Sequence, residues 1–213
     1  MHFFWTVEYQ MEIIKPKLLI IAGPNGSGKT SVTWKILEHE WVEGCIYLNP
    51  DQIAKDTFGD WNSPDAVIKA ANLSAEMRED ALLKKQSLIF ETVLSAPDKL
   101  EYIKRAKEAG FFIRLFFVGT NHPSINASRI AHRVMEGGHD VPITKIISRH
   151  SKSIANCCRA VQLVDRAYIY DNSIDYHEPA LLFRTKNGNI EKVYTDINNW
   201  AELIFESAKN YAG

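Results

Sequence analysis

The stretch from residue 23 to residue 30, GPNGSGKT, matches the pattern G-x-x-x-x-G-K-[ST] at every position. It directly follows the apolar run KLLIIA, a predicted strand, and directly precedes a predicted helix. Gly26 and Gly28 can adopt backbone angles that let successive N–H groups turn inward around phosphate oxygens, and the positive end of the helix points at the same anion. The motif predicts a binding site for ATP or GTP.

The side chains that close the motif have separate predicted tasks. Lys29 is expected to reach the β- and γ-phosphates, and the hydroxyl of Thr30 to ligate Mg²⁺. The alternative, a glycine turn with an exposed lysine, is disfavoured because every position and both flanks agree. We expect the nucleotide to contact Gly23, Pro24, Asn25, Gly26, Ser27, Gly28, Lys29, Thr30 and Ser31.

A second set of polar residues follows later apolar runs, at the strand ends where ligands collect in open α/β sheets. Asp51 stands in YLNPDQIA, and Glu91 and Thr92 stand in LIFETVLS. A kinase needs a carboxylate that takes or orients the proton of the acceptor hydroxyl, and Asp51 is our candidate. The alternative for Asp51 is an N-cap of the helix QIAKDTF. Glu91 could bind a substrate hydroxyl, lie near Mg²⁺ or be solvated, and Thr92 could be only a strand former.

Arginines form the third set. Arg129 and Arg133 are four residues apart on a predicted helix, so their side chains leave the same face, and Arg149 lies on the next helix. The segment EGGHDVP between these helices predicts a lid, within about residues 124–160, that swings the arginines over the phosphates. One well-placed arginine can raise the rate of phosphoryl transfer by about 10³ to 10⁵. The alternative is a solvated face with weak surface ion pairs.

Other classes of phosphate-loop protein lack support in the sequence. No apolar strand ends in Asp-Glu, as a motor or transporter ATPase requires, and neither an LSGGQ-like loop nor an Asn-Lys-x-Asp loop is present. The nearest match, AYIYD, ends at Asp171 and is followed by Asn172. A kinase is therefore favoured over these ATPases and over a GTPase.

The alternation of apolar and amphipathic segments predicts an α/β fold of the P-loop nucleotide-kinase kind, with a mainly parallel sheet flanked by helices. An Asn-Gly pair at 187–188 predicts a C-terminal β-hairpin, and a last helix is expected from about Ile197. Strands are predicted at about 17–22, 45–49, 87–93, 111–118 and 166–170, and helices at about 28–41, 64–86, 98–109, 124–136 and 142–162.

Composition limits the remaining choices. The 213 residues, 46% of them hydrophobic, predict one domain over 1–213, with 1–15 as an N-terminal extension in which Met11 could be the native start. Lys and Arg number 25 against 26 Asp and Glu, so neither nucleic acid nor an anionic membrane is an expected partner. Three cysteines without disulfide or zinc spacing, and no recognisable signal peptide, favour the cytoplasm.

Six segments, taken in chain order within residues 17–173, resemble the zeta toxin family of P-loop kinases. They are GPNGSGKT, YLNPDQIA, LIFETVLS, RVMEGGHDVP, SRHSKSIAN and YDNS. The resemblance is strongest to its broad bacterial branch, often labelled predicted ABC-type ATPases. Zeta toxins use ATP and Mg²⁺ to phosphorylate the 3′-hydroxyl of the amino sugar in UDP-N-acetylglucosamine. The GGHDVP lid and the arginine spacing differ from the better-understood toxins.

The resemblance implies a role for each matching residue. Asp51 would activate the acceptor hydroxyl, Arg133 and Arg149 would steady the transferring phosphate, and the substrate side would be formed by Glu91, Thr92 and Arg129. It also implies a hydroxylated small-molecule acceptor such as a UDP-sugar and a separate antitoxin protein. The competing hypothesis is a nucleotide-binding regulatory module with slow ATPase activity.

Overall fold

The computed structural model describes residues 15–58, 63–138 and 140–209. Except for Lys15, the predicted N-terminal extension lies outside these described residues. Within the three described stretches, no helix is both long enough and apolar enough to cross a bilayer.

Strand β1 (Lys17–Ala22) lies at the centre of the sheet that carries the phosphate loop. It pairs in parallel with β3 (Leu88–Thr92) on one side and with β4 (Phe112–Gly119) on the other. Residues 18–22 are fully buried, which is why this strand has the continuous apolar sequence typical of a strand covered on both faces.

The strands of the described residues form one seven-stranded sheet in the order β2-β3-β1-β4-β5-β6-β7. The five predicted strands are all present and parallel, and the predicted C-terminal hairpin adds two antiparallel strands. The remaining strands are β2 (Ile46–Leu48), β5 (Arg166–Asp171), β6 (Ala180–Lys186) and β7 (Asn189–Val193). The predicted α/β fold class is confirmed.

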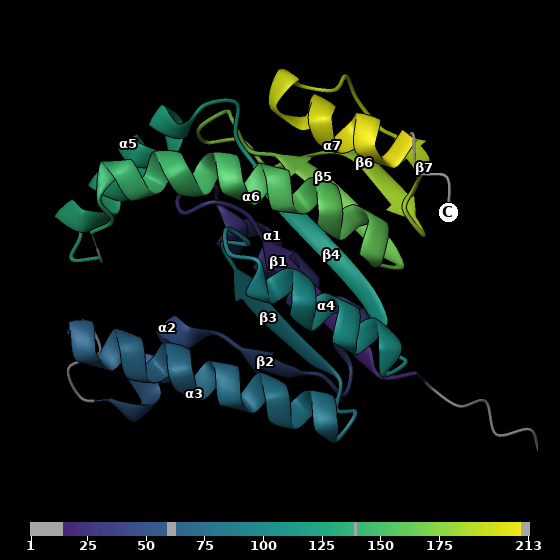
Figure 1. The fold of residues 1–213 in the computed structure, drawn as a ribbon. Coiled ribbons are helices and arrows are strands. Elements are labelled where there is room, and N and C mark those ends of the chain that lie inside the picture. The colour runs from purple at the N-terminus through teal and green to yellow at the C-terminus, as the bar shows by residue number, and fades with distance from the viewer. Residues whose placement is uncertain (1–14, 59–62, 139, 210–213) are drawn as a thin grey trace, which may run out of the picture.

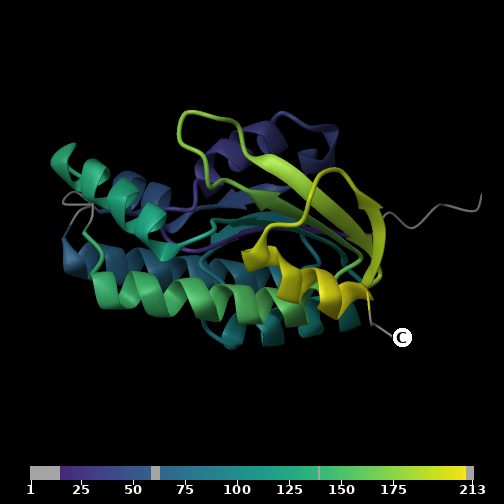
Figure 2. The same cartoon turned by 90° about the horizontal axis from the view of Figure 1, so that it is seen from above.

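Helices cover the two faces of this sheet unequally (Figures 1 and 2). One face is covered by α3 (Pro64–Leu83), α4 (Asp98–Glu108), α6 (Ile143–Leu163) and α7 (Asn199–Lys209), and the larger apolar core lies beneath them. The other face holds α1 (Lys29–Leu37) over a smaller core. Two further helices, α2 (Pro50–Thr57) and α5 (Pro123–Met135), follow the carboxyl ends of β2 and β4.

Residues typical of element ends fix the start of α3 and the turn between β6 and β7. The Ser63 hydroxyl accepts a hydrogen bond from the backbone N–H of Ala66, 3.2 Å away, and caps α3, with Pro64 at the first helical position. Asn187 and Gly188 have φ of +49° and +80°, the left-handed pair that a tight hairpin turn requires.

The predicted helix at 28–41 is interrupted. Helix α1 ends at Leu37, and a separate 3-10 helix, η1 (Glu40–Val42), follows it. The ring of His39 accepts a hydrogen bond from the N–H of Trp41 and caps η1. Because a side-chain cap starts a new helix here, the amphipathic pattern alone overestimated the length of α1.

The end of β5 is tied to α7 by a buried carboxylate. Asp171 Oδ1 accepts hydrogen bonds from the indole N–H of Trp200 at 2.8 Å and from the hydroxyl of Ser173 at 2.6 Å. Asp171 is 9% exposed. The carboxylate at the end of AYIYD therefore has a structural task.

We expect Asp171→Ala to lower the free energy of unfolding by about 1–3 kcal/mol, because it leaves the indole N–H of Trp200 buried without its acceptor. Urea denaturation followed by circular dichroism measures this difference. Asp196→Ala, at an exposed position, is the matched control and should change stability by no more than about 0.5 kcal/mol. Equal stability of the two variants would contradict the assignment.

Candidate active site

The phosphate loop joins the end of β1 to the start of α1. Its Gly23, Gly26 and Gly28 have φ of +147°, +74° and +85°, a region that only glycine adopts without strain. Space is also limiting, since a Cβ on Gly28 would lie 2.0 Å from Nδ2 of Asn172. Gly28 is the N-cap of α1 and offers no side-chain cap, so the start of the helix is open to an anion, although the N–H of Ser31 already donates to the carbonyl of Gly28 at 3.2 Å.

Side chains from other elements hold this loop in place. Asn172, after β5, donates from Nδ2 to the carbonyl of Ser27 at 2.9 Å, and Asn126 of α5 donates from Nδ2 to the carbonyl of Asn25 at 2.7 Å. Arg149 of α6 donates from Nη1 to Oδ1 of Asn25 at 3.1 Å. The loop is therefore fixed from three directions.

The ammonium group of Lys29 lies against the loop. Its Nζ donates to the carbonyls of Gly23 at 2.9 Å and Pro24 at 3.1 Å. Lys29 thus folds back over the loop that is expected to hold the phosphates.

Burial lowers the pKa of Lys29 to about 8. Repulsion from Arg133 and Arg149 contributes to this net lowering, whereas attraction by Glu91 and Asp51 opposes it. Four of the predicted site residues are therefore close enough to Lys29 to share its electrostatic field.

These residues line one hollow of about 1030 Å³ at the carboxyl ends of the central strands. Four of the predicted nucleotide contacts are not in this lining. Gly23, Pro24 and Ser27 are buried residues of the loop, and Ser31 is exposed outside the hollow. The predicted residues in the lining are Asn25, Gly26, Gly28, Lys29, Thr30, Asp51, Glu91, Thr92, Arg129, Arg133 and Arg149.

Glu91 is held by two hydroxyl groups. Its Oε1 accepts hydrogen bonds from Tyr47 Oη at 2.6 Å and from Thr33 Oγ1 at 3.0 Å. Burial, together with the hydrogen bond to Glu91, raises the pKa of Tyr47, so the phenol remains a donor. Glu91 is therefore an oriented carboxylate and not a freely solvated strand end.

The alternative interpretation of Asp51 as a helix cap is wrong. Asn49 caps α2, because its Oδ1 accepts from the backbone N–H of Asp51 at 2.9 Å and from that of Gln52 at 3.4 Å. Asp51 is the second residue of the helix and is exposed, with its side chain in the lining of the hollow. Its carboxylate is not used as a cap and lies on the same hollow as Lys29.

Two predicted substrate contacts also have structural bonds. The Thr92 hydroxyl accepts from the backbone N–H of Leu94 at 3.0 Å and supports the turn after β3. The guanidinium of Arg129 donates to Oδ1 of Asp175 at 2.8 and 2.6 Å and to the carbonyl of Asn172 at 2.9 Å. Arg129 thus fixes the segment after β5, while still lining the hollow.

The segment expected to act as a lid connects α5 to α6. Gly137 has φ of +89°, and the N–H of Gly138 donates to the carbonyl of Arg133 at 2.8 Å. Residue 139 lies outside the described part of the chain. Movement of this segment stays a prediction.

Sequence reasoning did not identify five residues that support the site. Two of them had a signal: Pro at the next position marks Asn49 as a cap, and Asn172 belongs to the quoted segment YDNS. The other three, Thr33, Tyr47 and Asn126, bond to residues far away in the chain, which no local pattern reveals.

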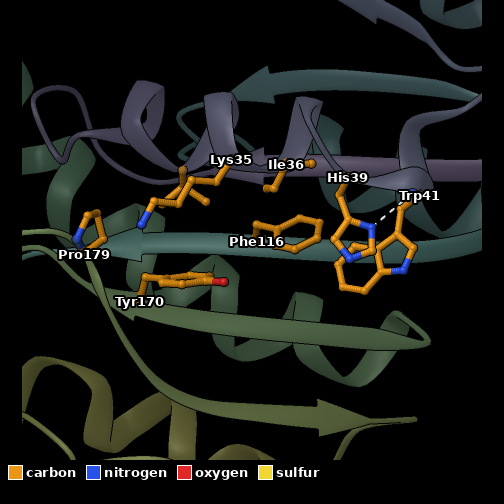
Figure 3. A pocket seen from close by; sticks show the side chains of 8 residues that line it. Lys35, Ile36, His39, Trp41, Phe116, Tyr170 and Pro179 are labelled. Carbon is orange, nitrogen blue, oxygen red and sulfur yellow. Dashed lines mark hydrogen bonds between the residues drawn. The ribbon is translucent and has the colours of Figure 1, made fainter.

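A smaller hollow, of about 190 Å³, lies on the face of the sheet that α1 covers, between α1, β4 and β5 (Figure 3). Phe116 and Tyr170 belong to its walls, with Lys35 and Ile36 on the helix side. It contains none of the predicted site residues and is separate from the candidate active site.

The residues of the larger hollow fit Mg²⁺ bound together with a nucleotide. The described residues contain no group of three His, Cys, Asp or Glu side chains that could hold a metal ion by themselves. Mg²⁺ bound with phosphates needs only one or two protein ligands. Thr30, exposed in the first turn of α1, and the oriented carboxylate of Glu91 supply suitable oxygens.

A family model described as zeta toxin matches residues 5–194 of this chain. An uncharacterized protein of Haemophilus influenzae is 30% identical over 133 residues, which are 62% of this chain and 91% of that protein.

Solved structures share the fold. A structure from the PezAT chromosomal toxin-antitoxin system of Streptococcus pneumoniae has a TM-score of 0.57 and 14% identity, and the match covers 84% of this chain and 75% of that one. The AvrRxo1-ORF1:AvrRxo1-ORF2 structure with sulphate ions has a TM-score of 0.65 and 19% identity, covering 93% of this chain and 66% of that one. The AvrRxo1-ORF1:-ORF2 structure with ATP has a TM-score of 0.63, 19% identity and the same two coverages.

We expect Gly28→Ala to weaken ATP binding by at least about tenfold, because the added methyl group meets Asn172 and strains the loop. Isothermal titration calorimetry measures the affinity. Gly44→Ala is the matched control, because Gly44 also has a left-handed φ of +75° but has open space around its Cβ position. Equal affinities in the two variants would refute a role for the loop.

Nucleotide affinity should fall as the pH rises from about 7.5 to about 9.5, by up to about tenfold per pH unit. The amine of Lys29 loses its proton above a pKa of about 8 in the free protein, and a bound triphosphate favours the charged form. Calorimetry in buffers of different ionisation enthalpy would show proton uptake on binding. Lys29→Arg keeps its charge over this range, so its affinity should depend less on pH.

Proposed function

The chain belongs to the zeta toxin family, and from that membership we propose that it is an ATP-dependent kinase that transfers the γ-phosphoryl group to a hydroxyl of a small metabolite. As a phosphotransferase, it needs a phosphate grip, positive charge around the transferred group and a carboxylate for the acceptor. The observation that carries the proposal is that all three line the same hollow: the phosphate loop with Lys29, the pair Arg133 and Arg149, and Asp51.

The nucleotide side follows from the loop and its neighbours. The N–H groups at the start of α1 bind the phosphates, and Lys29 leaves the loop carbonyls for the β- and γ-oxygens. Arg149 and Arg133 then stabilise the negative charge that develops on the transferring group. Mg²⁺, held by Thr30 and by phosphate oxygens, would supply further charge neutralisation when bound.

Asp51 serves the acceptor side. It lies at the second position of α2, where it is exposed and lines the hollow, and its backbone N–H is held by Asn49. From there it orients the acceptor hydroxyl in line with the γ-phosphorus and takes its proton as the new P–O bond forms, while the bond from the γ-phosphorus to the bridging oxygen breaks and ADP leaves.

The acceptor is proposed to be an anionic metabolite of the UDP-sugar kind, such as UDP-N-acetylglucosamine. The hollow, at about 1030 Å³, is at the upper end of the range of about 300–1000 Å³ for single-ligand sites, which leaves room for a second ligand beside ATP. Among the described residues of its lining, six are cationic and three are carboxylates, which favours anions. The six are Lys29, Lys55, Arg129, Arg133, Lys145 and Arg149, and the three are Asp51, Glu91 and Asp140.

A separate protein that neutralises the kinase is the proposed macromolecular partner. Support comes from the similar PezAT structure, which belongs to a toxin-antitoxin system, and from the AvrRxo1-ORF1:AvrRxo1-ORF2 structure, which contains two proteins. Co-purification with the product of a neighbouring gene would test this pairing.

We expect Asp51→Asn to lower turnover by about 10² or more while Mg·ATP still binds. The substitution removes the base that takes the proton of the substrate hydroxyl, and it leaves the phosphate loop that binds the nucleotide unchanged. The measurement is transfer of label from γ-labelled ATP to metabolites of a cell extract, with mass spectrometry of the product. Asp56→Asn, an exposed position on the same helix, is the control and should retain turnover.

Each outcome of this assay discriminates. Label on an organic acceptor supports the kinase, whereas label recovered only as inorganic phosphate favours a nucleotide-binding module with slow ATPase activity. Unchanged turnover in the Asp51 variant would remove this residue from the mechanism.

A further inference from the structure

A continuous series of hydrogen bonds links the phosphate helix to Glu91 and to the backbone of Asp51. Thr33 on α1 and Tyr47 on β2 both donate to Oε1 of Glu91, at 3.0 and 2.6 Å. Tyr47 Oη in turn accepts from Nδ2 of Asn49 at 3.0 Å, and Oδ1 of Asn49 holds the N–H of Asp51 at 2.9 Å. Four elements, α1, β3, β2 and α2, are joined by these bonds.

The centre of the series is the phenol of Tyr47. It uses its one proton on Glu91 and one lone pair on Asn49, so a single atom connects the two carboxylate-bearing segments of the hollow. A hydrogen bond to an ionised acceptor is about twice as strong as one between neutral groups. The bond between Tyr47 and Glu91, with its 2.6 Å separation, belongs to this stronger class.

Thr33 fixes the same oxygen from the other side. Its hydroxyl lies within reach of the Lys29 carbonyl at 3.1 Å as well as Glu91 at 3.0 Å, and the carboxylate is the stronger acceptor for the one available proton. With Oε1 held by two donors, rotation of the Glu91 carboxylate is restricted.

We propose that Tyr47 is a positioning residue for phosphoryl transfer, which fixes the Glu91 carboxylate so that Oε2 faces the ligands. The inference rests on the proposed kinase function and adds a residue to it. Phosphoryl transfer depends on alignment, and a displacement of about 1 Å can cost up to about 10²-fold in rate.

The test is Tyr47→Phe, which removes only the hydroxyl. We expect kcat to fall about tenfold or more, while the KM for ATP changes by less than about threefold, because the nucleotide grip is untouched. Tyr168→Phe is the matched control, since Tyr168 is a tyrosine of β5 that stacks on Phe116, away from Glu91, and its kcat should stay unchanged. Equal kcat in wild type and Tyr47→Phe would overturn the proposal.

A second comparison separates positioning from a general structural effect. If Tyr47 acts through Glu91, Tyr47→Phe should reduce kcat by less than about twofold in a Glu91→Gln background. Losses that multiply would overturn the inference. Should Tyr47→Phe fail to fold, Thr33→Val tests the other donor to the same oxygen, with the same expected direction.

Crystal structures of wild type and Tyr47→Phe keep this test independent of the acceptor. The proposal expects the Glu91 carboxylate to be displaced or to occupy several rotamers in the variant. An unmoved Glu91 would overturn the positioning role, even if the wild type is an active kinase. A wild type that transfers no label would instead refute the proposed function, while the crystal structures still decide whether Tyr47 holds Glu91.

Discussion

A loop that binds phosphate through its backbone N–H groups must hold its conformation before the ligand binds, and the neighbouring elements of the fold are arranged to hold it. The loop is formed by glycines because neighbouring chain lies so close: a Cβ on Gly23 would be 2.2 Å from the carbonyl oxygen of Val118 on β4, and one on Gly26 would be 2.6 Å from the carbonyl oxygen of Asn126. The sheet order, with β1 between β3 and β4, surrounds the loop with such neighbours. The fold stabilises a backbone conformation that few sequences tolerate.

The same crowding sets the electrostatics. Burying Lys29 beside Arg133 and Arg149 lowers its pKa, because its charge is then poorly solvated and repelled. Glu91 and Asp51 offset part of this repulsion. The two carboxylates therefore stabilise the cationic cluster, and they are also the groups proposed to receive the acceptor hydroxyl.

Sequence patterns identified the features that depend on neighbours in the chain. The phosphate loop, the parallel strands and the hairpin turn at Asn187 all follow from periodicity or from residues within a few positions. The hydrogen bonds of Thr33 and Tyr47 to Glu91 could not be predicted from the sequence. They form because β2 lies beside β3 in the sheet and because α1 brings Thr33 to the end of β3. The cap of α2 was open to prediction, since Pro at the first helical position identifies Asn49 as the cap.

The phosphate loop and Asp51, on two sides of the hollow, follow strands that are held unequally in the sheet. The nucleotide half is attached to β1, which is paired on both sides at the centre of the sheet, whereas Asp51 follows β2, a three-residue strand at the edge. A short edge strand has one partner and fewer ladder bonds to fix the residues that follow it. The bond from Tyr47 to Glu91 compensates for this, because it connects the edge strand to β3, and Tyr47 also accepts a bond from Asn49 at the start of α2. The residues proposed to receive the acceptor can therefore vary in position with α2 and β2, while the phosphate loop stays fixed to β1.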